Sequence, residues 1–219
     1  MKTKNTATFF AILAAALYAI NIPCSKLLLQ KVQPTMMAAL LYLGAGIGLF
    51  FWGLSAQENG EKLTKQELPY TIGMVVLDIA APILLMFGLR HTTSANASLL
   101  NNFEIVATSL IACFVFRERL SKRLVLAIVL VTVASIALSF EGAGSFRFHS
   151  GSLLVLAAAC CWGLENNCTR MLSNKSSTQI TTIKGTFSGF GSLIVALLLG
   201  ERLPGLIWIV LVLVLGFVA

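Results

Sequence analysis

Residues 95–121 read ANASLLNNFEIVATSLIACFVFRERLS, and this stretch decides the fold class. It is a long apolar run with one carboxylate, Glu104, near its middle and a basic cluster at 117–123. An apolar run of about 20 residues is long enough to cross a bilayer as a helix. A charge near the bilayer centre costs about 2.5–3.5 kcal/mol even on the mildest scale, so we expect Glu104 to face protein or water.

The composition of the whole chain is that of a polytopic membrane protein. Of its 219 residues, 57% are hydrophobic and 11% are charged, whereas soluble domains carry about 25% charged residues. The formal net charge is +7, but Lys and Arg lie mostly in short segments between apolar runs, which argues against a nucleic-acid-binding protein. The five cysteines follow no disulfide or metal spacing. We therefore expect neither a metal site nor a cofactor.

Apolar runs of spanning length divide the chain, and each predicts a helix because it lacks the alternation of a barrel strand. Seven complete runs and a shorter eighth lie at about 7–27, 35–54, 69–89, 95–115, 123–140, 151–171, 180–199 and 204–219. The predicted fold class is an all-α multi-pass membrane protein. With the N-terminus inside, ten loop or end Lys and Arg residues lie inside and five outside. This bias favours a cytoplasmic N-terminus in the cell (inner) membrane.

The first and sixth predicted helices are similar in sequence. A shift of 144 residues aligns Tyr18 with Trp162 and Asn21 with Glu165. Because five helices precede the second copy, that copy is inverted relative to the first, as in many secondary transporters. We predict a first repeat at 1–141 and a partial second repeat at 151–219. Counterparts of the fourth and fifth helices are missing, so we expect a truncated chain.

The pattern NNFEIVA…RERLS at 101–121 resembles the EamA repeat of the drug/metabolite transporter superfamily. That repeat typically has Glu-Pro in its fourth helix and then a loop close to GERLS, whereas here Ile105 replaces the proline and Arg117 the glycine. Matching segments also include YAIN…SK in the first helix, LRHTTSANASLL before the fourth and WG in the second unit. The resemblance implies ten helices in two inverted five-helix EamA repeats, with both termini cytoplasmic.

The same resemblance implies a secondary-active transporter, and not an enzyme, that exports amino acids or other small organic metabolites by alternating access. Protons are candidate coupling ions, and a homodimer is a candidate assembly within the lipid bilayer. One alternative is a non-transporting, truncated remnant of such a transporter. Another is an intramembrane enzyme, which the sequence disfavours because both histidines, His91 and His149, lie in predicted loops.

Glu104 is the first candidate for the transport pathway. Ala97, Asn101, Glu104 and Thr108 follow a 4, 3, 4 spacing and therefore share one face of a helix. This polar stripe is suited to the wall of a cavity. A carboxyl group removed from water can take up and release a proton near neutral pH. The alternative is a structural acid that Asn or backbone groups of a neighbouring helix satisfy.

Asp78 and Glu104 lie 13 residues on either side of position 91. In an antiparallel pair they reach a similar depth and could share a proton or a cation. Alternatively, Asp78 hydrogen-bonds to another helix. Pro82, one turn beyond Asp78, is expected to kink its helix.

Glu165 and Lys184 lie 9.5 residues on either side of the centre of their connection. Antiparallel neighbours hold them level, which predicts an ion pair. The functional alternative is that one of them exchanges its partner for a charged substrate, and Lys184 can also reach toward the interface.

Asn21 is a candidate because it aligns with Glu165, and Asn166 because it follows Glu165 directly. Trp162 either packs between helices or forms an aromatic wall with Tyr18. The glycines at 44–48 and 185–191 predict close helix packing. The candidate residues of the pathway are Glu104, Asn101, Asp78, Asn21, Glu165, Asn166, Lys184 and Trp162.

Overall fold

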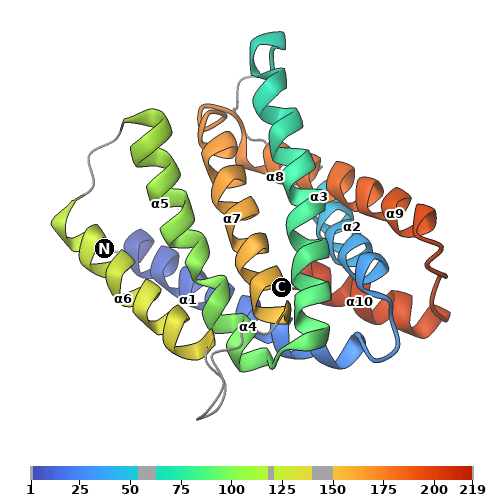
Figure 1. Cartoon of the computed structure of the whole chain (residues 1–219). Helices are drawn as coiled ribbons and strands as arrows, with labels where there is room; N and C mark the ends of the chain where they lie inside the picture. The colour runs from blue at the N-terminus through green and yellow to red at the C-terminus, as the bar shows by residue number, and fades with distance from the viewer. Residues whose placement is uncertain (1, 54–62, 118–120, 140–149, 219) are drawn as a thin grey trace.

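The computed structural model describes residues 2–53, 63–117, 121–139 and 150–218, and these are largely helical (Figure 1). The helices are α1 Lys2–Leu28, α2 Pro34–Gly53, α3 Leu68–His91, α4 Ser94–Asn101, α5 Phe103–Phe116, α6 Lys122–Ser139, α7 Ser150–Arg170, α8 Ser177–Ile183, α9 Gly189–Leu198 and α10 Leu206–Val218. A 3-10 turn, η1 Lys65–Glu67, precedes α3, and a π-helical segment, η2 Lys184–Ser188, joins α8 to α9. No strand occurs in the described ranges.

Five helical stretches of the described residues are long and apolar enough to cross a membrane. They are Thr8–Leu28, Pro34–Phe51, Lys65–His91, Ser94–Val115 and Ser177–Leu198, while Leu206–Val218 is apolar but shorter. The described part of the chain thus has helices and no strands, and it has the spans of a multi-pass membrane protein. The count of seven complete spans with a partial eighth, and the inverted repeat, stay predictions.

Two predicted helices are less regular than their apolar runs suggest. The run at 95–115 breaks between α4 and α5 at Asn102, whose side-chain amide donates to the Ser98 carbonyl at 3.2 Å. Such local side-chain bonding competes with regular helix hydrogen bonding. The run at 180–199 begins earlier, at Ser177, and contains the π-helical η2. By contrast, α3 continues through Pro82 as one helix from Leu68 to His91.

Helix α7 packs against α3 and α5, and α2 packs against α9, η2 and α10 (Figure 1). Glycines allow both contacts. Gly163 of α7 faces Ala107 of α5, and a Cβ on Gly185 of η2 would lie only 2.5 Å from the Cα of Gly46 in α2. Because glycine has no side chain, it permits close approach of helices in membranes. The packing role predicted for the two glycine runs is confirmed.

Charged side chains from distant segments satisfy the ends of α2 and α3. The buried Glu201 carboxylate accepts the N–H groups of Thr35 at 3.1 Å and Met36 at 2.6 Å, at the start of α2. The Lys26 ammonium donates to backbone carbonyls at the end of α3, including that of Thr92 at 2.7 Å. An anion at a helix N-terminus and a cation at a C-terminus are both favourable. These contacts fix the two helices that carry Tyr42 and Asp78.

Candidate functional site

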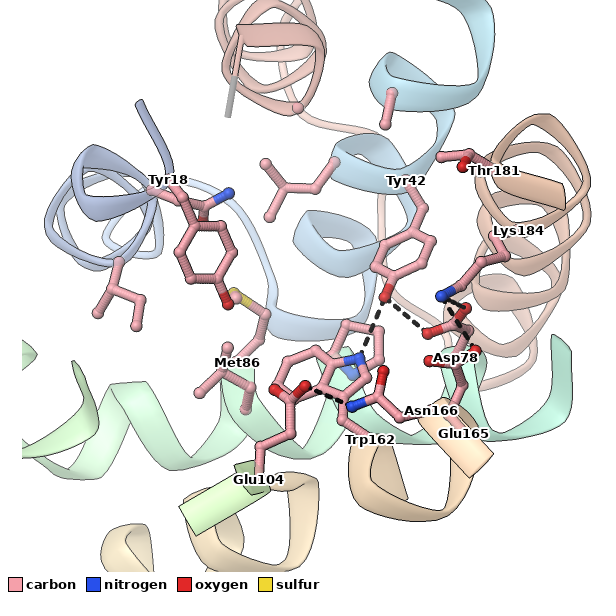
Figure 2. Close-up of a pocket in the computed structure, with 18 residues that line it drawn as sticks. Tyr18, Tyr42, Asp78, Met86, Glu104, Trp162, Glu165, Asn166, Thr181 and Lys184 are labelled. Atoms are coloured by element: carbon pink, nitrogen blue, oxygen red, sulfur yellow. Dashed lines mark hydrogen bonds and ion pairs between the residues drawn. The ribbon is translucent and has the colours of Figure 1, made fainter. Parts of the chain in front are cut away.

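A cavity of about 350 Å³ lies among α1, α2, α3, α5, α7 and the α8–η2 segment (Figure 2). Its walls combine aromatic rings with polar and charged side chains that come from separate helices. The polar and aromatic lining residues are Tyr18 and Asn21 of α1, Tyr42 of α2, Asp78 of α3, Glu104 of α5, Trp162, Glu165 and Asn166 of α7, Thr181 of α8 and Lys184 of η2. Seven of the eight predicted pathway residues therefore lie on one cavity.

Lys184 is the centre of a three-charge cluster at one side of this cavity. Its Nζ lies 3.0 Å from Glu165 Oε1 and 3.6 Å from Asp78 Oδ2. The ion pair predicted between Glu165 and Lys184 is confirmed, and Asp78 joins it as a third member. The Lys184 side chain is 23% exposed, whereas those of Glu165 and Asp78 are 2% and 1% exposed. All three line the cavity, and Lys184 is the most exposed of them.

Aromatic side chains hold the Asp78 carboxylate from the other side. The Tyr42 hydroxyl donates to Asp78 Oδ1 at 3.0 Å, and Trp162 Nε1 donates to the Tyr42 oxygen at 3.3 Å. Figure 2 shows this chain of hydrogen bonds running from α7 through α2 to α3. Trp162 therefore lines the cavity and also supports Tyr42, while an aromatic wall for a substrate stays a prediction.

Glu104 has a different set of partners. Asn166 Nδ2 donates to Glu104 Oε1 at 2.7 Å and to Thr108 Oγ1 at 3.2 Å. Glu104 and Thr108 hence face α7 together, as their spacing predicts. Asp78 and Glu104 both line the cavity, but no hydrogen bond or ion pair joins them in the described part of the chain. The direct sharing of a proton or cation by these two acids has no contact to support it.

Asn101 is the predicted pathway residue that does not line this cavity. It is buried, and its amide donates to the Tyr18 hydroxyl at 3.2 Å. Ala97, from the same predicted stripe, is fully buried in the core. The break at Asn102 lies between these residues and Glu104. Asn101 bonds to Tyr18 of α1, whereas Glu104 and Thr108 bond to Asn166 of α7.

Tyr42 is the principal site residue that was not predicted from the sequence. It bridges Asp78 and Trp162, and it is the one tyrosine in the apolar run that forms α2. A single tyrosine in an apolar run, next to the glycines at 44–48, was the sequence feature that could have indicated this site residue. Thr169 is a second such residue, since its hydroxyl donates to Glu165 Oε1.

The charge balance of the cavity is uneven. Its lining holds three carboxyl groups, from Asp78, Glu104 and Glu165, and one ammonium group, from Lys184. Lys184 pairs with two of the acids, while Glu104 is bonded to the neutral Asn166. Within the described ranges, no group of three or more His, Cys, Asp and Glu side chains is arranged to hold a metal ion. The arrangement is suited to bind cations and to exchange protons.

Known proteins similar to this chain are named as transporters. An uncharacterized transporter of Methanothermobacter thermautotrophicus is 30% identical, over 86% of this chain and 60% of the relative. The uncharacterized transporter YetK of Bacillus subtilis is 22% identical, over 84% of this chain and 58% of the relative. The chain thus spans about three fifths of the length of these curated relatives.

A solved crystal structure of a protein shares the fold. It aligns with a TM-score of 0.71 over 98% of this chain and 75% of that one, at 15% sequence identity. The model of the EamA-like transporter family matches residues 5–140, which is more than half of the 219 residues. The chain therefore belongs to the EamA-like transporter family.

Proposed function

We propose that this protein is a secondary-active transporter that exports amino acids or other small organic metabolites by alternating access. In this proposal the substrate binds in the cavity lined by Tyr42, Asp78, Glu104, Glu165 and Lys184. Membership of a transporter family supports the general activity. The cavity supports the specific site, because separate helices contribute aromatic, polar and charged side chains to its lining.

The observation that carries the proposal is a set of charged side chains on one cavity, three of which, Asp78, Glu104 and Lys184, lie inside candidate membrane spans. Ionisable groups at such depth are costly, and they usually mark substrate or ion pathways. Burying an ion pair contributes little net stability compared with apolar packing. A triad of Asp78, Glu165 and Lys184 on a cavity wall is therefore better explained by transport than by folding.

The internal similarity supports a site between two repeats, 1–141 and 151–219. Tyr18 and Trp162, which align with each other, both line the cavity, and so do Asn21 and Glu165. Inverted repeats of transporters place the substrate between the halves, and one half rocks against the other. The tight contact of Gly46 with Gly185 lies between the proposed repeats and offers a surface for such movement. The proposal includes a cytoplasmic N-terminus in the inner membrane.

Glu104 is proposed as the acid that couples transport to protons. Its one side-chain partner on α7 is the neutral Asn166, so it can gain or lose a proton without breaking an ion pair. Asp78 and Glu165 are less suited, because protonation of either would remove a partner of Lys184. A proton-accepting group that faces the cavity is what coupling requires.

The test is proton-driven efflux from proteoliposomes loaded with a defined mixture of amino acids. An imposed pH gradient should drive efflux by the wild type, and mass spectrometry of the external medium identifies what leaves. Glu104→Gln should lose gradient-driven efflux while it retains exchange of the same compounds without a gradient. Glu67→Gln, which removes an acid that lies outside the cavity and pairs with Lys175, is the matched control. Undiminished gradient-driven efflux by Glu104→Gln would refute the coupling role.

A further inference from the structure

We propose that substrates of this cavity carry an ammonium group that displaces Lys184 from Asp78 and Glu165. Lys184 is then a tethered cation that occupies the site while no substrate is bound. The inference rests on the proposed function, because it names the substrate class of the same cavity. It separates amines and amino acids from neutral or purely anionic metabolites.

Among the described residues, the triad leaves one carboxylate oxygen of Asp78 without a hydrogen bond. Lys184 Nζ lies 3.0 Å from Glu165 Oε1 but 3.6 Å from Asp78 Oδ2. Asp78 Oδ2 is buried and accepts no hydrogen bond in the described part of the chain. A buried acceptor without a hydrogen bond carries a desolvation cost. An ammonium group has three donors and can meet this oxygen and Glu165 together.

The position of Lys184 makes displacement feasible. Its side chain is partly exposed and reaches the two carboxylates from the cavity wall, whereas both carboxylates are almost fully buried. The ammonium can therefore leave along the cavity without disturbing the packed core. Figure 2 shows the Lys184 ammonium opposite Tyr42, whose ring lies beside the triad, with Trp162 nearby. Aromatic rings of this kind can contact the apolar part of an amine and can attract its charge.

The balance of charge disfavours an anionic substrate. If Lys184 bound an isolated carboxylate or phosphate, it would have to leave Asp78 and Glu165. Both acids would then lack a cation, as Glu104 already does in the described part of the chain. Unpaired buried charges are strongly unfavourable. An ammonium group instead replaces Lys184 at the acids. An amino acid can form a second ion pair, because its carboxylate can pair with the displaced Lys184.

The displaced lysine lies on a segment suited to change shape. Lys184 begins the π-helical η2, and the next residue, Gly185, touches Gly46 of α2. Short π-helical turns within α-helices are frequent at functional sites. Releasing Lys184 from α3 and α7 frees η2 to move against α2, which links substrate binding to movement between the proposed repeats.

The test measures binding of n-butylammonium to the purified protein in detergent by calorimetry. If Lys184 occupies the acids about 90% of the time, it raises the apparent Kd of the wild type about tenfold. Lys184→Ala should therefore bind n-butylammonium about tenfold more tightly than the wild type. Adding Asp78→Asn and Glu165→Gln to that variant should abolish binding. Lys175→Ala, which removes a lysine that pairs with Glu67 outside the cavity, should match the wild type.

Equal affinity of the wild type and Lys184→Ala, or binding no tighter than that of neutral n-butanol, overturns the inference. If Lys184→Ala yields no folded protein, purification in n-butylammonium should restore the yield and n-butanol should not; failure to restore it also overturns the inference. Amino-acid efflux by the wild type is measured in parallel. Efflux without n-butylammonium binding contradicts this inference alone, and the predicted binding without efflux contradicts the proposed function while it supports the site.

Discussion

Removal of the Lys184 ammonium should strongly destabilise the protein. Nζ lies 3.0 Å from Glu165 and 3.6 Å from Asp78, and at an effective dielectric constant of about 20 each contact amounts to about 5 kcal/mol of attraction. Desolvation offsets much of this attraction. Removing one partner of a buried pair costs about 3–5 kcal/mol, because the other charge stays buried. We expect Lys184→Met to lose about that much, since it leaves two buried carboxylates without their cation.

The companion variants show whether the loss comes from charge. Glu165→Gln alone should cost less, about 1–3 kcal/mol, because Lys184 still pairs with Asp78. The double variant combines Lys184→Met with Glu165→Gln. Its loss of stability should be smaller than the sum of the two single losses by more than about 1 kcal/mol, as expected for residues in direct contact. The assay is reversible unfolding from mild detergent with SDS, followed by tryptophan fluorescence. Additive losses would refute the argument, because they would mean that Lys184 and Glu165 do not interact.

Two further predictions concern helix ends and helix contacts. Glu201→Gln should lower stability by about 0.5–2 kcal/mol in the same assay, because the carboxylate caps α2 through the N–H groups of Thr35 and Met36; stability equal to the wild type would contradict the cap. Gly185→Val should reduce both folded yield and amino-acid efflux, because even a Cβ there would lie 2.5 Å from the Gly46 Cα, whereas normal yield and efflux would contradict the contact.

Continuous apolar runs allowed most helices to be predicted, because lipid requires satisfied backbones and apolar surfaces. Symmetric spacing about a turn likewise predicted the ion pair of Glu165 and Lys184, since antiparallel neighbours place such positions level. The glycine runs predicted close helix contacts, because glycine has no side chain to keep two helix backbones apart. These features depend on local composition or on one adjacent connection.

Features that depend on distant contacts could not be predicted in this way. The cap on α2 joins Glu201 to residues more than 160 positions earlier in the chain. The bridge of Tyr42 between Asp78 and Trp162 needs three helices to be placed at once. The break at Asn102 and the π-helical η2 lie inside apolar runs of normal length, so hydropathy gave no sign of them. Residues 118–120, part of the RERLS segment that resembles the EamA loop, lie outside the described residues.

Filling the cavity with a large side chain tests whether the cavity is the substrate pathway. Ala45 lines the cavity and carries no charge, so Ala45→Trp adds an indole there without changing any ionisable group. Ala134 is exposed on α6, and Ala134→Trp provides the same substitution away from the cavity. Amino-acid exchange in proteoliposomes should be lost in Ala45→Trp and retained in Ala134→Trp, with both proteins folded. Exchange at the wild-type rate by Ala45→Trp would show that the substrate does not pass through this cavity.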